Sequence, residues 1–178
     1  GAESVLASEI DYKVNIDSII ENIRQVLSQN STKTLSENGF TPAGVMLLLC
    51  PKDDDHFVIL NKRSDYVEYH KREISFPGGV QDPEDRDILA TALRETHEEM
   101  GILPSDIDVL GRLDEVATNS RFGVTSFVGT IPFPYEFKIN AAEIAEVVEA
   151  PLSSLMDSCN LREESWVDDC GYISKIYS

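Results

Sequence analysis

The sequence predicts a mixed α/β (α+β) domain, because helical and strand patterns are both present and do not alternate strictly. Apolar residues recur at helical spacing in two segments, residues 15–29 and residues 89–100. A nearly unbroken apolar run from Ala43 to Cys50 is typical of a central strand that is covered on both faces. With 178 residues, 42% of them apolar, the chain is long enough for one buried core. We therefore expect residues 1–178 to form a single domain.

The other elements are short and are separated by turn residues. A helix is predicted over about residues 15–29, and the polar residues 30–39 after it read as a loop. Strands are expected in segments rich in Val, Ile, Phe and Thr, namely residues 57–61, 107–113, 123–131, 166–167 and 172–176. The first of these returns from the 43–50 strand through an acidic turn. Pro151 opens a short helix that reaches about Met156.

The stretch from Phe76 to Ile102 organises the chain around one amphipathic helix. Its apolar positions recur every three or four residues and can pack on a core; they are Leu89, Ala92, Leu93, Thr96 and Met100. Asp85 or Asp87 can cap the helix N-terminus, and Gly101 lies where a helix usually ends.

The opposite side of this helix carries three carboxylates. Glu95, Glu98 and Glu99 lie at i, i+3 and i+4, so they are neighbours on one face. They crowd the C-terminal turns, where the helix dipole disfavours a negative charge by roughly 0.3–1 kcal/mol. This could be a solvated acidic face in which Arg94 pairs with Glu98. The turn 77–79 just upstream favours a metal-phosphate site instead, because a glycine carbonyl can approach a ligand closely and Mg²⁺ prefers oxygen ligands.

These residues resemble the Nudix hydrolase family. Its motif has a Gly, a Glu six residues later, and then Arg-Glu, an apolar residue, any residue, Glu-Glu, any residue, Gly and an apolar residue. Residues 94–102 match the second half, with Thr96 at the apolar position. The first half departs, because Gly79 is one residue farther from Arg94 than in the family and Arg86 stands where the Glu is expected. Asp85 or Asp87 could supply that carboxylate.

A second resemblance concerns the segment before this motif. Residues 59–64, His70 and residues 74–79 are similar to the motif that precedes the Nudix box in the coenzyme A diphosphatase subgroup, and the lengthened loop after Gly79 is also similar. Two positions depart from it, because Glu68 replaces an Arg and Arg72 replaces a Gly.

The resemblance implies a Nudix-type α/β/α sandwich with a mixed β-sheet. It also implies hydrolysis of a nucleoside diphosphate linked to another moiety, with coenzyme A as the expected substrate and 3′,5′-ADP and 4′-phosphopantetheine as products. Mg²⁺ or Mn²⁺ would be the cofactor. The expected metal ligands are Gly79, Glu95, Glu98 and Glu99. The expected catalytic residues are Arg94, Glu95, Glu98 and either Glu143 or Glu146. The expected substrate-binding residues are Arg63, Ser64, His70 and Arg72.

Two alternatives remain open. The mismatches at Glu68 and Arg72 favour a Nudix hydrolase for an ADP-sugar or a dinucleoside polyphosphate. The missing carboxylate at Arg86 favours a non-catalytic module that binds a nucleotide or a partner protein. The cations Arg63, Lys71 and Arg72 could contact the 3′-phosphate of coenzyme A, since a guanidinium suits phosphate recognition.

Composition restricts the partners. Fifteen Lys and Arg against 32 Asp and Glu give a net charge of −17, which repels nucleic acid and anionic membranes. The partner that the resemblance implies is a small-molecule diphosphate. Three cysteines without metal-ligand spacing predict neither a disulfide framework nor a zinc site, and they fit a reducing, cytoplasmic compartment. No apolar run approaches the length of a membrane helix.

The C-terminal residues 164–178 read as a hairpin after which nothing helical follows. Members of the resembled family usually close with a further strand and helix. We therefore expect either that a C-terminal segment is missing or that an apolar patch is covered by the N-terminal helix or by a second subunit in a homodimer.

Overall fold

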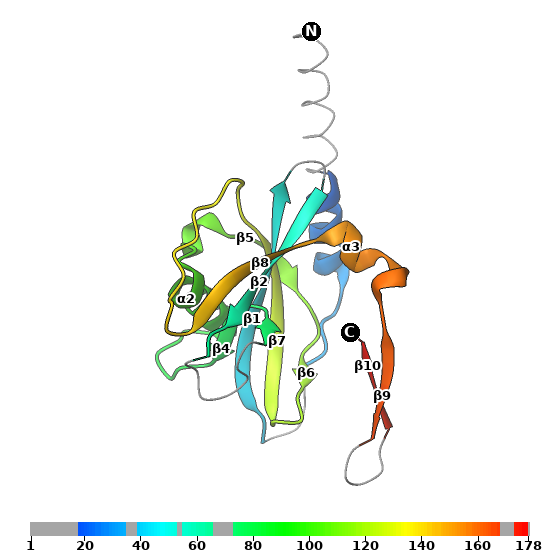
Figure 1. Ribbon diagram of the computed structural model, residues 1–178. Coiled ribbons are helices and arrows are strands. Elements are labelled where there is room, and N and C mark those ends of the chain that lie inside the picture. The colour runs from blue at the N-terminus through cyan, green and yellow to red at the C-terminus, as the bar shows by residue number, and fades with distance from the viewer. Residues whose placement is uncertain (1–17, 35–38, 53–54, 66–72, 168–172, 178) are drawn as a thin grey trace.

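The fold is described from a computed structural model, which places residues 18–34, 39–52, 55–65, 73–167 and 173–177. Its centre is a mixed sheet (Figure 1). The strands of this sheet are β1 Thr41–Lys52, β2 Asp55–Arg63, β3 Ile74–Ser75, β4 Gly78–Val80, β5 Asp108–Arg112, β6 Val116–Ala117, β7 Phe122–Thr130 and β8 Ile144–Pro151. The helical elements are residues 18–29, α2 Ile88–Met100, η1 Pro104–Asp106, α3 Leu152–Met156 and η2 Ser158–Asn160. A separate hairpin is formed by β9 Glu163–Val167 and β10 Ile173–Tyr177.

The expected central strand is β1. It pairs in parallel with β7 along most of its length and antiparallel with β2 near the hairpin that joins them. Because β5 and β8 pair antiparallel with β7 and β2, the sheet is mixed. The predicted fold class, a mixed sheet with helices, is therefore confirmed.

β1 and β2 pair only near their connecting hairpin, from Leu48 opposite Ile59 to Lys52 opposite Asp55. β8 occupies one edge of β2, so β3 lies on the edge that faces β1, where it pairs with β2, while β4 pairs with β1. The segment 74–80 therefore fills the space where β1 and β2 separate. The backbone N–H of Met46 donates to the carbonyl of Pro77 in this segment at 2.9 Å.

Helices cover both faces of the sheet (Figure 1). On one face α2 packs on a core whose buried members are Met46, Leu48, Cys50, Ile59, Ala92, Met100, Ile102, Ile107, Phe127 and Ile131. On the other face the helical residues 18–29 bring Ile20, Ile23 and Leu27 onto Leu49, Val58, Leu110 and Val128. The apolar spacing in both segments explains why each helix buries one side. The helical residues 18–29 therefore cover the face of the sheet opposite α2.

The ends of α2 follow the sequence signals. Asp87 is the N-cap, because its side chain accepts a hydrogen bond from the backbone N–H of Ala90. Gly101 ends the helix with φ 71°, a left-handed conformation that glycine adopts without steric cost. Asp85, the other candidate cap, has a different role that is described below.

The predicted C-terminal hairpin is confirmed by the antiparallel pairing of Ile173 with Val167 through Tyr177 with Glu163. β9 and β10 form a two-stranded sheet of their own (Figure 1). Within the described ranges, no helix combines the length and the apolar composition that crossing a membrane requires. The single-domain boundary and the covering of the C-terminal part by a second subunit stay predictions.

Candidate active site

The backbone of β4 lies directly against the carboxylate side of α2. Gly79 on β4 pairs with Gly44 on β1, and a Cβ atom added at Gly79 would lie 2.6 Å from Cδ of Glu95. Only a residue without a side chain allows this approach. The contact brings the backbone of Gly79 against the carboxylate of Glu95 on α2, as the turn 77–79 and the spacing of the helix residues predict.

Glu99 is the most buried of the three carboxylates, with 3% of its surface exposed. Its Oε2 accepts hydrogen bonds from Nδ2 of Asn61 at 2.8 Å and from the backbone N–H of Gly78 at 3.2 Å. Burial is the main cause that raises the pKa of Glu99 to about 7, and the negative charges of Glu95 and Glu143 add to it. The Gly78 hydrogen bond and the charge of Arg63 oppose this rise.

Arg94 lies between the other two carboxylates. Its Nη1 is 2.9 Å from Oε1 of Glu95 and 3.1 Å from Oε2 of Glu98. Its Nε and Nη2 donate to the two oxygens of Asp85 at 2.9 and 3.0 Å, a bidentate pair that fixes the guanidinium plane. Burial raises the pKa of Glu95, the contact with Arg94 opposes that rise, and the negative charge of Glu98 adds to it.

Asp85 lies close to Arg94 at the N-terminal end of α2. Besides Arg94 it accepts a hydrogen bond from Oγ1 of Thr91 at 2.8 Å, and the hydrogen bonds from Arg94 hold the pKa of Asp85 well below its ordinary value. Arg86, where the family has a Glu, is largely exposed and pairs with Asp87. Of the two candidate carboxylates, the structure therefore brings Asp85 to Arg94.

The structure brings one of the two candidate glutamates near β8 to the site. The charge of Glu143 adds to the burial that raises the pKa values of Glu95 and Glu99, and its Oε1 accepts from Asn140 at 2.9 Å. Glu146 pairs with Lys62 at 3.3 Å on the exposed surface. Its neighbour Val147 lies opposite Asn61, whose side chain points to α2, so Glu146 faces the other side of the sheet. Glu146 is not brought to the carboxylates.

The substrate-binding candidates are placed in part. Arg63 ends β2, its charge reaches Glu99, and its buried Nε has no hydrogen-bond partner among the described residues. Ser64 is buried; its Oγ donates to the carbonyl of Ala142 and its N–H to the carbonyl of Glu143. These bonds tie the end of β2 to the turn that carries Glu143. His70 and Arg72 lie outside the described residues.

Two site residues were not singled out from the sequence, Asn61 and Ser75. Asn61 is fully buried on β2, and Oγ of Ser75 donates to its Oδ1 at 2.7 Å. An asparagine within an otherwise apolar strand was the available signal, since a buried amide requires hydrogen-bond partners.

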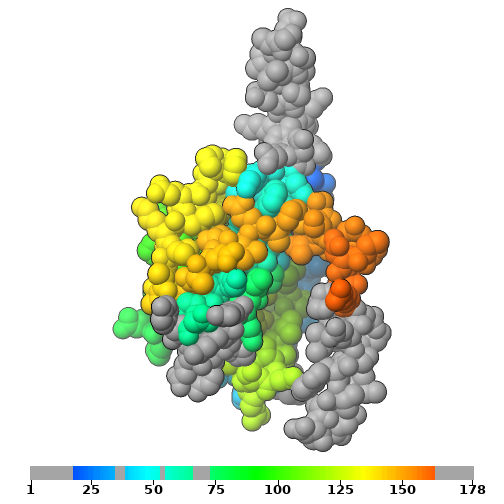
Figure 2. All heavy atoms as spheres, viewed as in Figure 1, coloured from blue at the N-terminus to red at the C-terminus, as the bar shows by residue number. Residues whose placement is uncertain are grey.

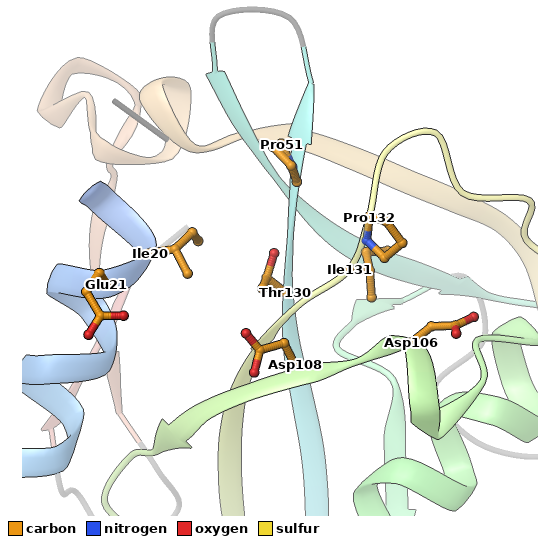
Figure 3. A pocket seen from close by; sticks show the side chains of 8 residues that line it. All are labelled: Ile20, Glu21, Pro51, Asp106, Asp108, Thr130, Ile131 and Pro132. Carbon is orange, nitrogen blue, oxygen red and sulfur yellow. The ribbon is translucent and has the colours of Figure 1, made fainter. Parts of the chain in front are cut away.

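One cleft among the described residues lies away from these carboxylates. A cleft of about 480 Å³ is lined by Ile20, Glu21, Pro51, Asp106, Asp108, Thr130, Ile131 and Pro132 (Figure 3). Thr130 lies opposite Leu49 on β1, five residues from Gly44, or roughly 16 Å along the strand from the carboxylates. Figure 2 shows the surface formed by β8 and α3, drawn in shades of orange. The candidate site is therefore defined by side-chain chemistry.

Comparison with known proteins agrees with this geometry. Residues 40–166 match the family model described as the NUDIX domain. The chain belongs to the Nudix hydrolase family. The Nudix hydrolase NudL of Photorhabdus laumondii, which is itself described as uncharacterized, is 38% identical over 125 residues. NudL of Yersinia enterocolitica is 34% identical over 142 residues, which cover 80% of this chain and 70% of that protein.

This chain matches only part of the length of several relatives. The alignment covers 70% of this chain and 65% of the P. laumondii protein, and with NudL of Yersinia pestis it covers 48% of that protein at 39% identity. Among solved structures, the Nudix hydrolase RenU of M. smegmatis gives a TM-score of 0.56 at 21% identity over 71% of this chain and 83% of that one. The C. elegans Ap4A hydrolase binary complex gives 0.54 at 17% identity, covering 62% and 80%. These structures establish the Nudix fold.

Nudix hydrolases generally use divalent metal ions. The donors available in this chain are carboxylate and carbonyl oxygens, which suit a hard cation. Oε1 of Glu99 has no hydrogen-bond or ion-pair partner among the described residues, and the carboxylate of Glu95 lies directly against the backbone of Gly79. In the described part of the chain no three His, Cys, Asp or Glu side chains already form a metal cluster. Nη1 of Arg94 contacts one oxygen of Glu95 and one oxygen of Glu98, so the second oxygen of each carboxylate takes no part in these two contacts.

Proposed function

We propose that this Nudix chain hydrolyses the diphosphate of a nucleoside diphosphate joined to another moiety, with Mg²⁺ or Mn²⁺ as cofactor. The observation that carries the proposal is the meeting of Gly79, Glu95 and the buried Glu99 at the separation of β1 and β2. A buried carboxylate beside two others is costly unless a cation or a proton neutralises it. A site that binds cations and phosphates explains why these groups are kept together.

The residues of the chain would divide the work as follows. Glu95, Glu98, Glu99 and the carbonyl of Gly79 would hold the ions, which supply charge neutralisation for the diphosphate and acidify a water molecule. Arg94, fixed by Asp85, orients Glu95 and Glu98 through charge-assisted hydrogen bonds. A single carboxylate, Glu95 or Glu143, would accept the proton of the attacking water.

The specific substrate that we propose is coenzyme A or one of its derivatives, cleaved to 3′,5′-ADP and 4′-phosphopantetheine. Support comes from the resemblance of the Arg63-Ser64 and Phe76-Pro77 segments to the coenzyme A diphosphatase motif and from the charge of Arg63, which acts on Glu99. We assign Arg63 to the diphosphate and not to the 3′-phosphate, because the charge of its guanidinium acts on Glu99. Recognition of the remote 3′-phosphate is then assigned to Arg72 or its neighbours.

A substrate panel tests this proposal. Coenzyme A, dephospho-coenzyme A, ADP-ribose and diadenosine tetraphosphate are incubated with the chain and Mg²⁺ or Mn²⁺, and the products are separated by chromatography. We expect coenzyme A to exceed dephospho-coenzyme A in kcat/KM by about ten- to a hundredfold, the value of one charge-assisted phosphate contact. Faster turnover of ADP-ribose would assign the chain to ADP-sugars, and no turnover of any diphosphate would leave a nucleotide-binding module.

Two variants locate the cations. Arg63→Ala should slow all diphosphate substrates to a similar extent, whereas Arg72→Ala should remove the preference for coenzyme A over its dephospho form. Lys62→Ala is the matched control, because Lys62 pairs with Glu146 on the other face of the sheet. A Lys62→Ala variant that also changed the preference would contradict this placement.

A further inference from the structure

We propose that Asn61 and Ser75 are positioning residues that hold one oxygen of Glu99 and leave the other oxygen for a divalent cation. The inference rests on the proposed function, because it assigns Glu99 to the metal. Ser75 donates to Asn61 at 2.7 Å, and Asn61 donates to Glu99 at 2.8 Å. The three side chains form one chain of hydrogen bonds from β3 through β2 to α2.

The direction of these hydrogen bonds follows from chemistry. An ionised carboxylate only accepts, so Asn61 must present its amide nitrogen to Glu99. A hydroxyl on the other side can then donate to the amide oxygen, which is what Ser75 does. Because a hydroxyl can either donate or accept, it is the charge of Glu99 that fixes the amide orientation. The Ser75 hydroxyl then satisfies the amide oxygen and holds the Asn61 side chain against Glu99.

The hydrogen bonds divide the two oxygens of Glu99. Oε2 accepts both from Asn61 and from the backbone N–H of Gly78, whereas Oε1 has no partner among the described residues. The side chain is almost fully buried, so Glu99 has little contact with solvent. One fixed oxygen and one available oxygen are the arrangement of a carboxylate that binds an ion through a single atom.

The arrangement also depends on strand register. Asn61 and Ser75 are direct partners in the β2–β3 pair, and Gly78 follows three residues after Ser75. One short segment thus supplies both the hydroxyl that orients Asn61 and the N–H that contacts Glu99. A shift of this segment by one residue would turn the Ser75 side chain to the other face and break the relay.

The test measures Mn²⁺ binding to the protein without substrate, by electron paramagnetic resonance of the free ion. Asn61→Leu should weaken Mn²⁺ binding by about ten- to a hundredfold, the usual effect of losing a residue that orients a metal ligand. Ser75→Ala should give a smaller loss, and Ser75→Thr, which keeps the hydroxyl, should restore affinity. Thr96→Val is the matched control, because Thr96 is equally buried on α2 but donates to the carbonyl of Ala92. Circular dichroism at the same temperature confirms that each variant is folded.

Two further measurements decide between positioning and general packing. In a Glu99→Gln background, Asn61→Leu should change Mn²⁺ affinity little, since its partner no longer binds the ion. In turnover, Ser75→Ala should lower kcat at limiting Mn²⁺ and leave KM for the diphosphate unchanged. Equal effects in both backgrounds, unchanged affinity in both single variants, or a wild type that binds no Mn²⁺ would each overturn the inference. If affinity follows the expected pattern and no diphosphate is hydrolysed, the inference stands and the proposed function fails.

Discussion

Gly79→Ala tests the contact on which the candidate active site depends. The added Cβ atom would lie 2.6 Å from Cδ and 2.7 Å from Oε1 of Glu95. Ordinary carbon contacts are about 3.5–4.0 Å, so the carboxylate must move by about 1 Å. A misplacement of this size at a reacting centre can cost about a hundredfold in rate. We expect kcat/KM for the best diphosphate substrate to fall by about that factor.

The fold should survive this substitution. Gly79 does not have a positive φ, so alanine is compatible with its backbone, and the obstructing atoms belong to a flexible side chain. The assay is product formation at saturating Mg²⁺, with the melting temperature measured in parallel. Val80→Ala is the control, because Val80 is the next residue on β4 and is 44% exposed.

A double-mutant cycle shows whether the effect passes through Glu95. In a Glu95→Gln background, whose carboxylate is already lost, Gly79→Ala should add little to the loss of activity. Full additivity of the two changes would mean that Gly79 acts on another group. Activity of Gly79→Ala within threefold of the wild type would show that the close approach has no part in the reaction.

Three other predictions follow from the described contacts. Glu98→Gln and Glu99→Gln should each lower turnover by about a hundredfold or more with the fold retained, and near-normal activity of both at saturating Mg²⁺ would remove the metal assignment. Asp85→Asn should lower kcat by about tenfold, because it loosens the guanidinium of Arg94 beside the carboxylates. Asp87→Ala should lower only the melting temperature, because it removes a helix cap. Equal effects of the two variants on kcat would contradict this division of roles. Burial lowers the pKa of His56 below 6.5, so the folded state favours the neutral imidazole and stability should fall as the pH drops below about 6.5. The variant His56→Phe should therefore show a smaller change of melting temperature between pH 7 and pH 5 than the wild type. An unchanged dependence of the melting temperature on pH would refute this.

The local elements could be predicted because their signals are local. The spacing of apolar residues predicted α2 and its buried side, and Gly101 predicted its end. The run from Ala43 to Cys50 predicted the central strand, since a strand paired on both edges and covered on both faces has no polar side. Helix geometry predicted that Glu95, Glu98 and Glu99 are neighbours, but not that Glu99 is buried together with Thr96 and Met100 while Glu98 stays exposed.

The choices between neighbouring residues could not be predicted, because they depend on register. The pairing of Lys62 with Glu146 turns Glu146 to the other side of the sheet from Asn61, whereas Glu143 lies in the turn before β8. Asp85 and Asp87 are equivalent as caps in the sequence. In the structure Asp87 accepts the capping hydrogen bond from Ala90, whereas Asp85 pairs with Arg94. The role of Asn61 requires knowing that β3 returns beside β2.

The separation of β1 from β2 explains why the site lies where it does. Two strands that diverge leave backbone polar groups without partners, and such groups must be satisfied when they are buried. The segment 74–80 satisfies them by pairing with both strands, and the N–H of Gly78 is directed to Glu99. The segment that completes the sheet therefore also supplies the close approach of Gly79 and the hydroxyl of Ser75. Substitutions in the segment 74–80 that alter only a side chain should therefore weaken metal binding before they destabilise the fold.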